Sequence, residues 1–281
     1  MKSFFSLAFL CASLGWPIAA YSQSLEAIAA MYENGEYTRI VAEVAHTESA
    51  EIARLRADAL QKLGQFTAAM EAYNTAIQMN PADGEAHLNR GICAMSLNNY
   101  AGAKVDLATA RRIHPSNPKT WYWSAALAYA EGENEPCLNH LAEAVKLKPD
   151  YLEAHYLGGA LFYDLGALKD AEKAFARCLE INPDHALSQL SLAMVFTEQL
   201  RYSKANAILD ALADSADDTV RTHALYQRGV SKYESRDREG ACADWETAAS
   251  LGDADAQNLV DTACADAKKK KLERRSVHVE F

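Results

Sequence analysis

Beyond its first 22 residues, this 281-residue sequence has no apolar run that approaches a membrane-spanning helix of about 20 residues. It is also short of positive charge, because 28 lysines and arginines stand against 38 aspartates and glutamates, a net charge of −10. An acidic chain is a poor partner for the phosphates of nucleic acid. The composition therefore disfavours integral membrane proteins and nucleic-acid-binding proteins.

The sequence also lacks the convergent polar groups of an enzyme. Its eight histidines are scattered without the spacing of a metal-binding motif, so we expect no metal and no cofactor. The best nucleophile and base pair is Cys137 with His140, which lie three residues apart and on neighbouring faces of one helix. We interpret Cys137 as a small apolar packing residue, because it falls in a column of such residues described below. No catalytic activity is expected.

The first 22 residues have the anatomy of a signal peptide. Lys2 is their only charge, an apolar run from Phe4 to Leu14 follows it, and the sequence Ala20-Tyr21-Ser22 offers a cleavage site before Gln23. The alternative, a buried N-terminal helix, would need a polar face that this run lacks. We expect the cleaved chain to be periplasmic or secreted, with a net charge of −11.

What the sequence has in abundance is internal repetition. Four prolines are spaced by 34 residues each time, and columns of small or large apolar residues recur at about the same interval. The prolines are Pro81, Pro115, Pro149 and Pro183. One small column is Ala57, Gly91, Ala125, Gly159, Ala193 and Gly229; a second is Ala69, Ala103, Cys137, Ala171, Ala205 and Ala241. The large column is Tyr73, Leu107, Leu141, Phe175, Leu209 and Trp245.

These columns predict a helix hairpin as the repeating unit. Two helices approach to about 8 Å only where small side chains face each other. Each large apolar residue fills the space beside such a contact, and the proline ends the second helix because it lacks a backbone donor. Gly64, Gly132, Gly166 and Asn98 fall between the paired helices, where a left-handed residue ends the first helix.

The 34-residue period, the columns and the terminal proline resemble the tetratricopeptide repeat, and we identify the sequence as resembling an exported bacterial protein of this family. The resemblance implies an all-α, right-handed superhelical solenoid of about seven helix hairpins with a C-terminal capping helix. Its divisions are a signal peptide over 1–22, a shortened repeat over 23–49, the array over 50–252, the capping helix over 253–267 and a basic tail over 268–281. The sixth hairpin, Ala186 to Leu212, departs from the pattern because it lacks both the glycine and the closing proline.

Two pairs of opposite charges recur 16 residues apart, Arg90 with Asp106 and Arg228 with Asp244. Each pair joins the first helix of a hairpin to its second helix. We interpret them as structural ion pairs worth about 1 kcal/mol when partly exposed.

Cleavage before Gln23 leaves five cysteines, so at most two disulfides can form within one chain. Cys93, Cys137 and Cys178 lie at packing positions and are expected to be buried thiols. Cys242 and Cys264 are equidistant from the turn at Asp253, so antiparallel helices folded there would bring the two cysteines level. The sequence predicts that they form a disulfide at the end of the array.

The resemblance implies that first helices line a concave binding groove. On each first helix, the stripe rotated by one residue from the packing stripe is expected to face this groove. The predicted groove residues are Leu88, Ile92, Met95, Tyr122, Tyr129, Tyr156, Tyr163, Leu190, Met194, Tyr226 and Tyr233. An alternative is that these rings only seal one first helix against the next.

The resemblance implies a scaffold or adaptor in the cell envelope that binds a partner protein segment in the groove. The surrounding negative charge predicts an apolar or aromatic partner with basic character. An alternative is a platform in an enzymatic or secretion complex, with the array acting only as a structural spacer. The clamp that some members use for a carboxylate is absent, because Leu88, Ile92, Tyr122 and Ala126 occupy its positions. The basic tail, Lys268–Arg275, predicts at most weak contact with anionic surfaces.

Overall fold

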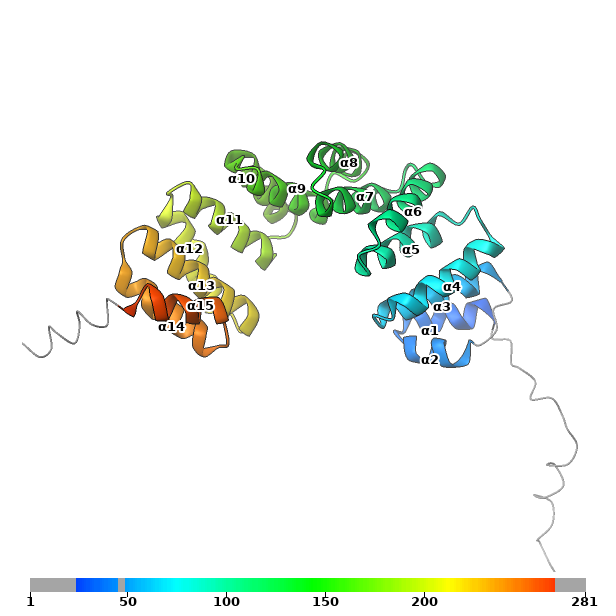
Figure 1. The fold of residues 1–281 in the computed structure, drawn as a ribbon, viewed down its shortest axis with the longest axis horizontal. Coiled ribbons are helices and arrows are strands. Elements are labelled where there is room, and N and C mark those ends of the chain that lie inside the picture. Colours follow the sequence, from blue (N-terminus) through cyan, green and yellow to red (C-terminus); the bar gives the residue numbers. More distant parts are fainter. Residues whose placement is uncertain (1–23, 45–48, 266–281) are drawn as a thin grey trace, which may run out of the picture. The chain divides into compact units, whose positions relative to one another are not determined.

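The computed structural model of the chain describes residues 24–44 and 49–265. The predicted signal peptide and basic tail lie outside these residues. In the described ranges the secondary structure is helical, with fifteen α-helices of which fourteen form seven hairpins and the last follows them (Figure 1). The predicted fold class, an all-α array of about seven helix hairpins, is therefore confirmed.

The described helices belong to two compact units, with the division between Ile113 and His114. The sequence pattern continues through this point and predicted a single array over 50–252. The first unit holds three hairpins: α1 (Leu25–Glu33) with α2 (Tyr37–Glu43), α3 (Ala50–Lys62) with α4 (Phe66–Met79), and α5 (Gly84–Ser96) with α6 (Tyr100–Ile113).

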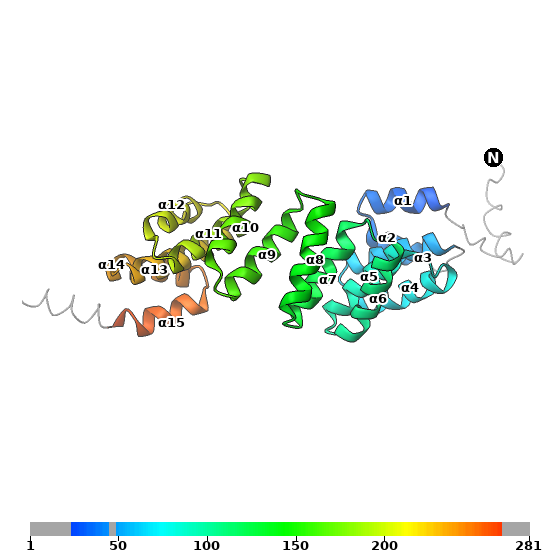
Figure 2. The ribbon, with the colours of Figure 1, turned by 90° about the horizontal axis from the view of Figure 1, so that it is seen from above.

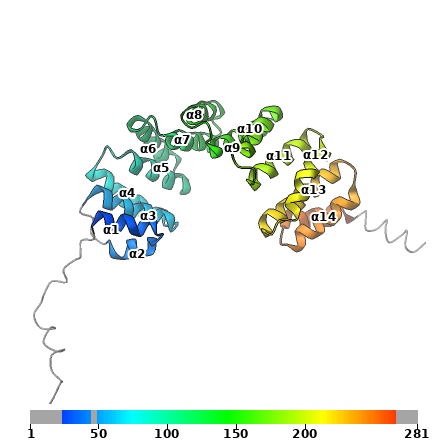
Figure 3. The same ribbon diagram turned by 180° about the vertical axis from the view of Figure 1, so that it is seen from behind.

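The second unit holds four hairpins and one further helix. The hairpins are α7 (Pro118–Ala130) with α8 (Asn134–Leu147), α9 (Leu152–Asp164) with α10 (Leu168–Ile181), α11 (Ala186–Glu198) with α12 (Tyr202–Ala213), and α13 (Asp218–Glu234) with α14 (Arg238–Ser250). The last helix is α15 (Ala254–Thr262). Each second helix of this unit contacts its own first helix and the helix that follows it, so the hairpins stack in chain order (Figure 3).

The recurring columns are the contact points within the hairpins. Every alanine and cysteine of the two small columns is fully buried, and the large column is buried from Tyr73 to Trp245. A Cβ atom added to Gly159 would lie only 2.6 Å from Cε1 of Phe175. The small residue is therefore a steric requirement for the packing of the large side chain on the partner helix.

The turns within the hairpins use one backbone conformation. The predicted residues have positive φ, at 72° for Gly64, 74° for Gly132, 70° for Gly166 and 57° for Asn98. In the sixth hairpin, Leu200 takes this conformation with φ of 61°, although an L-residue with a Cβ is disfavoured there. The turn geometry is thus kept where the sequence lacks a glycine.

The C-terminal end of the second unit is closed by α15, which lies against α14 (Figure 2). Ala256, Val260 and Cys264 are buried in the same apolar cluster as Trp245. A disulfide joins Cys264 to Cys242, with 5.8 Å between the two Cα atoms. This helix therefore covers apolar surface that the last hairpin would otherwise expose.

Three cysteines in the described residues are free, and all of them are buried. Burial raises the pKa of Cys93 to about 12 and that of Cys137 to about 11. Thiols with such pKa values are largely protonated near neutral pH. They are therefore unreactive packing residues in the folded chain, as predicted from their positions in the sequence.

Candidate functional site

The first helices of the second unit, α7, α9, α11 and α13, each contact the next first helix along the chain. Several half-buried tyrosines lie on these first helices. The second helices α8 and α10 form a separate row beside α7 and α9 (Figure 1). The six tyrosines on α7, α9 and α13 are Tyr122, Tyr129, Tyr156, Tyr163, Tyr226 and Tyr233. Their contacts divide them into packing residues and residues with a polar environment of their own.

Tyr122 and Tyr156 pack against other rings. The centroid of Tyr122 lies 5.3 Å from that of Tyr151, and burial raises the pKa of Tyr122. Tyr156 lies 5.6 Å from Phe175 and 5.8 Å from His185 by ring centroids. These two rings therefore seal consecutive repeats, as the alternative interpretation of the sequence proposed.

Tyr226 and Tyr233 both contact Trp245 of α14, near the C-terminal end of the second unit. The carbonyl of Tyr226 accepts a hydrogen bond of 3.1 Å from Nε1 of Trp245, and the Tyr233 ring lies 5.5 Å from that indole. The guanidinium of Arg238 lies 5.5 Å from the Tyr233 centroid. Burial raises the pKa of Tyr226, with Asp255 and Asp253 adding to the shift.

Tyr129 and Tyr163 have a different environment, because Tyr129 contacts a carboxylate of the next first helix and the pKa of Tyr163 is raised in part by the charge of one. The Tyr129 hydroxyl donates to the carboxylate of Asp164, and this bond raises the pKa of Tyr129 to about 12. The pKa of Tyr163 is raised first by burial and then by the charges of Glu198 and Asp164. Both phenols therefore remain protonated donors near neutral pH, next to exposed negative charge.

The carboxylates belong to a series of acidic residues at the ends of first helices. Asp164, Glu198 and Glu234 are the last residues of α9, α11 and α13, Glu131 is the C-cap of α7, and all four are exposed. Negative charge at a helix C-terminus is unfavourable by about 0.3–1 kcal/mol, because it faces the negative end of the helix dipole. No basic residue occupies the last turn of α7, α9 or α11. The helix dipole therefore disfavours these acids at the ends of α7, α9 and α11.

We call Tyr129, Tyr163, Asp164 and Glu198 the phenol–carboxylate face. Sequence analysis identified its two tyrosines but missed its two acids. The sequence could have identified the two acids, because Asp164 and Glu198 are 34 residues apart, the repeat interval, and each directly precedes the turn of its hairpin.

Two predicted groove residues are corrected by the structure. Leu88 and Leu190 are only 1% and 7% exposed, so neither side chain is available to a ligand. Leu190 occupies the register of Tyr122 and Tyr156, but its shorter side chain has no polar tip and lies wholly within the apolar cluster. Met194 is half-buried on α11. Ile92 and Met95 are half-buried on α5, in the first unit.

The predicted ion pairs are present and belong to larger structural networks. Arg90 donates to Asp106 at 2.6 and 2.8 Å, and His87 Nδ1 lies 3.1 Å from the same carboxylate. Arg228 donates to Asp244 at 2.7 and 2.9 Å. The bonds to Asp244 raise the pKa of Arg228. These contacts satisfy charges within hairpins and leave no reactive group free.

A polar cluster in the first unit was missed by the sequence analysis. The buried carboxylate of Asp58 accepts hydrogen bonds from the Tyr73 hydroxyl at 2.6 Å, from Asn89 at 2.9 Å and from Arg54 at 3.2 Å. Burial raises the pKa of Asp58, and the hydrogen bonds oppose this shift. Tyr73 could have indicated this cluster, because a phenol hydroxyl that is buried in an apolar column requires a hydrogen-bond partner. The cluster links α3, α4 and α5.

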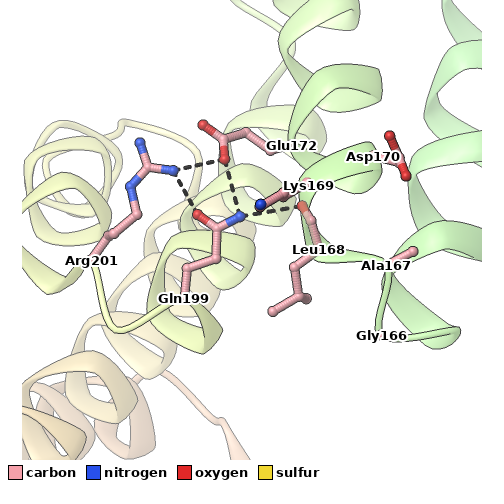
Figure 4. Close-up of a pocket in the computed structure, with 8 residues that line it drawn as sticks. All are labelled: Gly166, Ala167, Leu168, Lys169, Asp170, Glu172, Gln199 and Arg201. Atoms are coloured by element: carbon pink, nitrogen blue, oxygen red, sulfur yellow. Dashed lines mark hydrogen bonds and ion pairs between the residues drawn. The ribbon is translucent and has the colours of Figure 1, made fainter.

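An open recess of about 700 Å³ lies beside the turns of the fifth and sixth hairpins, with Gly166, Lys169, Glu172, Gln199 and Arg201 among its lining residues (Figure 4). Arg201 donates to Glu172 at 2.7 Å and to Gln199 at 2.6 Å. Gln199 in turn donates to Glu172 at 3.0 Å. This network joins α10 to the turn before α12, so it supports the hairpin that lacks a glycine.

Cys137 and His140 are the remaining candidate pair among the described residues. Cys137 is fully buried, whereas the His140 ring packs against Trp121 at 5.7 Å, so the pair remains best interpreted as packing. Residues 24–44 and 49–265 contain no group of three or more side chains suited to hold a metal ion. No helix in these ranges is both long and apolar enough to cross a bilayer.

Comparison with known proteins agrees with the repeat pattern. Residues 54–118 and 138–186 match the sequence profile of the tetratricopeptide repeat. DnaJ homolog subfamily C member 3 of Rattus norvegicus is 30% identical over 140 residues, which cover 50% of this chain and 27% of that protein. The matched part of the chain thus spans about a quarter of this relative's length.

Solved structures share the helical arrangement. A chain of the APC/C hetero-tetramer Cut9-Hcn1 superposes with a TM-score of 0.68 and 14% identity, over 88% of this chain and 50% of that chain. The pilF protein of Pseudomonas aeruginosa superposes with a TM-score of 0.64 and 16% identity, over 75% of this chain and 96% of that chain. At these identities the similarity shows the fold.

Proposed function

We propose that the chain is a tetratricopeptide-repeat protein and that its second unit captures a segment of a partner protein on the phenol–carboxylate face. The observation that carries the proposal is the position of Tyr129 and Tyr163, half-buried beside the exposed ends of the next first helices. A similar helical array occurs in the Cut9-Hcn1 hetero-tetramer, a protein assembly.

The chemistry of the face defines the partner segment. Tyrosine rings offer apolar area with little loss of rotamer freedom, and their hydroxyls add a polar contact. The carboxylates of Asp164 and Glu198 attract a lysine or arginine, which would also compensate the negative ends of their helices. The segment that fits therefore combines basic side chains with apolar or aromatic ones.

The test of this proposal is a peptide-display selection on the immobilised full chain. We expect enrichment of sequences with lysine or arginine next to aromatic residues. For a selected peptide, Tyr129→Ala with Tyr163→Ala, or Asp164→Asn with Glu198→Gln, is expected to weaken binding at least tenfold. Because Tyr129 and Tyr163 pack against the apolar clusters, the tyrosine pair is expected to lower stability as well. The acid pair should leave thermal unfolding nearly unchanged, so its effect on binding is the decisive one.

The matched control is Glu143→Gln with Glu180→Gln. These exposed acids lie on the second helices α8 and α10, so the pair changes the net charge equally away from the face. Equal weakening by the control pair and the face pair would mean that only overall charge matters. Failure to select any basic and aromatic peptide would reject the proposed function.

We also propose that the chain acts in the cell envelope or outside the cell. This rests on the signal-peptide features of residues 1–22, together with a disulfide of the kind that persists in oxidising compartments. N-terminal sequencing of the protein from an envelope fraction is expected to begin at Gln23. Recovery of the intact chain with Met1 from the cytoplasm alone would contradict this proposal.

A further inference from the structure

The basic segment Lys268–Arg275 of this chain has the chemistry that the phenol–carboxylate face would bind. It carries six lysines and arginines and one glutamate, whereas residues 23–267 carry 21 basic and 36 acidic residues. Building on the proposed function, we propose that this segment occupies the face and competes there with partner segments. The occupant is thus this segment of the same molecule, and binding of the segment of a second copy is an outcome that the test distinguishes.

Charge complementarity is the first argument. The exposed acids Asp164 and Glu198 end successive first helices, and the two phenols of the face carry no positive charge to compensate them. Lysine and arginine beside these carboxylates would gain from both the side-chain charge and the helix dipole. Leu272, within the segment, would place apolar area against the tyrosine rings.

Spacing is the second argument. Packed helices lie about 8–10 Å apart, so carboxylates at equivalent positions of successive first helices are separated by a similar distance. Three residues of chain in the polyproline II conformation cover about 9 Å and return to the same side. Lys268, Lys271 and Arg274 follow one another at intervals of three residues. Two of these side chains can therefore meet Asp164 and Glu198 together when the segment binds in this conformation.

Chain length is the third argument. The sequence continues for sixteen residues after Ala265, the last described position. In extended form sixteen residues span up to about 50 Å, which is several helix spacings. The length is thus compatible with binding in the same molecule, and an intermolecular arrangement uses the same contacts.

The experiment measures binding of a labelled synthetic peptide with the sequence of residues 266–281. Its main receptor is the full chain with a neutralised segment, in which Lys268, Lys269, Lys270, Lys271, Arg274 and Arg275 are each changed to Gln. We expect the peptide to bind this receptor, and to bind the unaltered chain at least threefold more weakly because the chain's own segment competes. Competition that persists on dilution indicates the same molecule, and competition that disappears indicates a second copy.

Variants of the face decide whether the peptide binds where we propose. In the neutralised receptor, Asp164→Asn with Glu198→Gln is expected to weaken peptide binding at least tenfold, whereas Glu143→Gln with Glu180→Gln should change it less than twofold. As a second measurement, an unlabelled peptide from the display selection should displace the labelled one. Peptide binding that is absent, or that the two pairs of substitutions affect equally, overturns the inference.

The outcomes also separate this inference from the proposed function. If selected peptides bind the face but the 266–281 peptide does not, the inference fails and the proposed function stands. If neither binds, both fail. If the 266–281 peptide instead binds vesicles of phosphatidylglycerol and phosphatidylcholine, and not the face, the segment contacts anionic lipid and the inference is rejected.

Discussion

Reduction of the Cys242–Cys264 disulfide is expected to lower the free energy of unfolding of the second unit by about 3 kcal/mol. The bond closes a loop with a sequence separation of 22, so it removes conformational entropy from the unfolded chain. It also holds α15 over Trp245 and the rest of the terminal apolar cluster. Without the bond, α15 can open separately from the remaining hairpins.

Urea unfolding of the oxidised chain, with and without a reductant, measures this effect. Cys242→Ser with Cys264→Ser should reproduce the reduced state and make the reductant ineffective. The buried thiols Cys93, Cys137 and Cys178 serve as an internal control, because alkylation of the folded oxidised chain should label none of them. Equal stability of the oxidised and reduced chains would show that the bond does not secure the terminal helix.

Gly159→Ala is expected to destabilise the second unit by about 1–3 kcal/mol. The added Cβ would lie 2.6, 2.8 and 2.9 Å from three atoms of the Phe175 ring. This ring is only 2% exposed and contacts Tyr156, so it cannot rotate away as a flexible chain end could. Either the ring or the helix pair must shift, and both displacements disturb the hairpin contact.

The neighbouring residue provides a matched control of opposite sign. A Cβ on Gly158 would meet only Cδ1 of Leu141, at an ordinary contact distance of 3.7 Å. Gly158→Ala should therefore stabilise α9 by about 0.5–1 kcal/mol, since alanine favours a helix over glycine. Thermal or urea unfolding of the two variants compares them directly. Destabilisation of similar size at both positions would contradict the assignment of Gly159 to the helix contact.

The phenol–carboxylate face was predicted only in part, because the sequence pattern shows neither which rings pack against each tyrosine nor which charges lie near it. Helical periodicity identified Tyr129 and Tyr163, but it treated all tyrosines of the stripe alike. Which ring is a packing residue depends on what the following helices bring next to it. Phe175 and His185 surround Tyr156, whereas Asp164 and Glu198 stand beside Tyr129 and Tyr163.

The sequence by itself determined the helix hairpin, because small and large residues that recur at a fixed interval favour the same close packing of two helices in every repeat. It also determined the left-handed turn residues Gly64, Gly132, Gly166 and Asn98, whose conformations are local properties of the chain. Both features can be predicted from the sequence alone, because each depends on residues that lie close together in the chain or recur at a fixed interval.

Only the tertiary structure decided the burial of Leu88 and Leu190, the left-handed conformation of Leu200 and the division of the helices after Ile113. It also brought the acidic ends of α9 and α11 beside tyrosines of the preceding first helices. Each of these features depends on contacts between residues of different helices. Their free energy depends on how neighbouring repeats pack, which a pattern within one repeat does not specify.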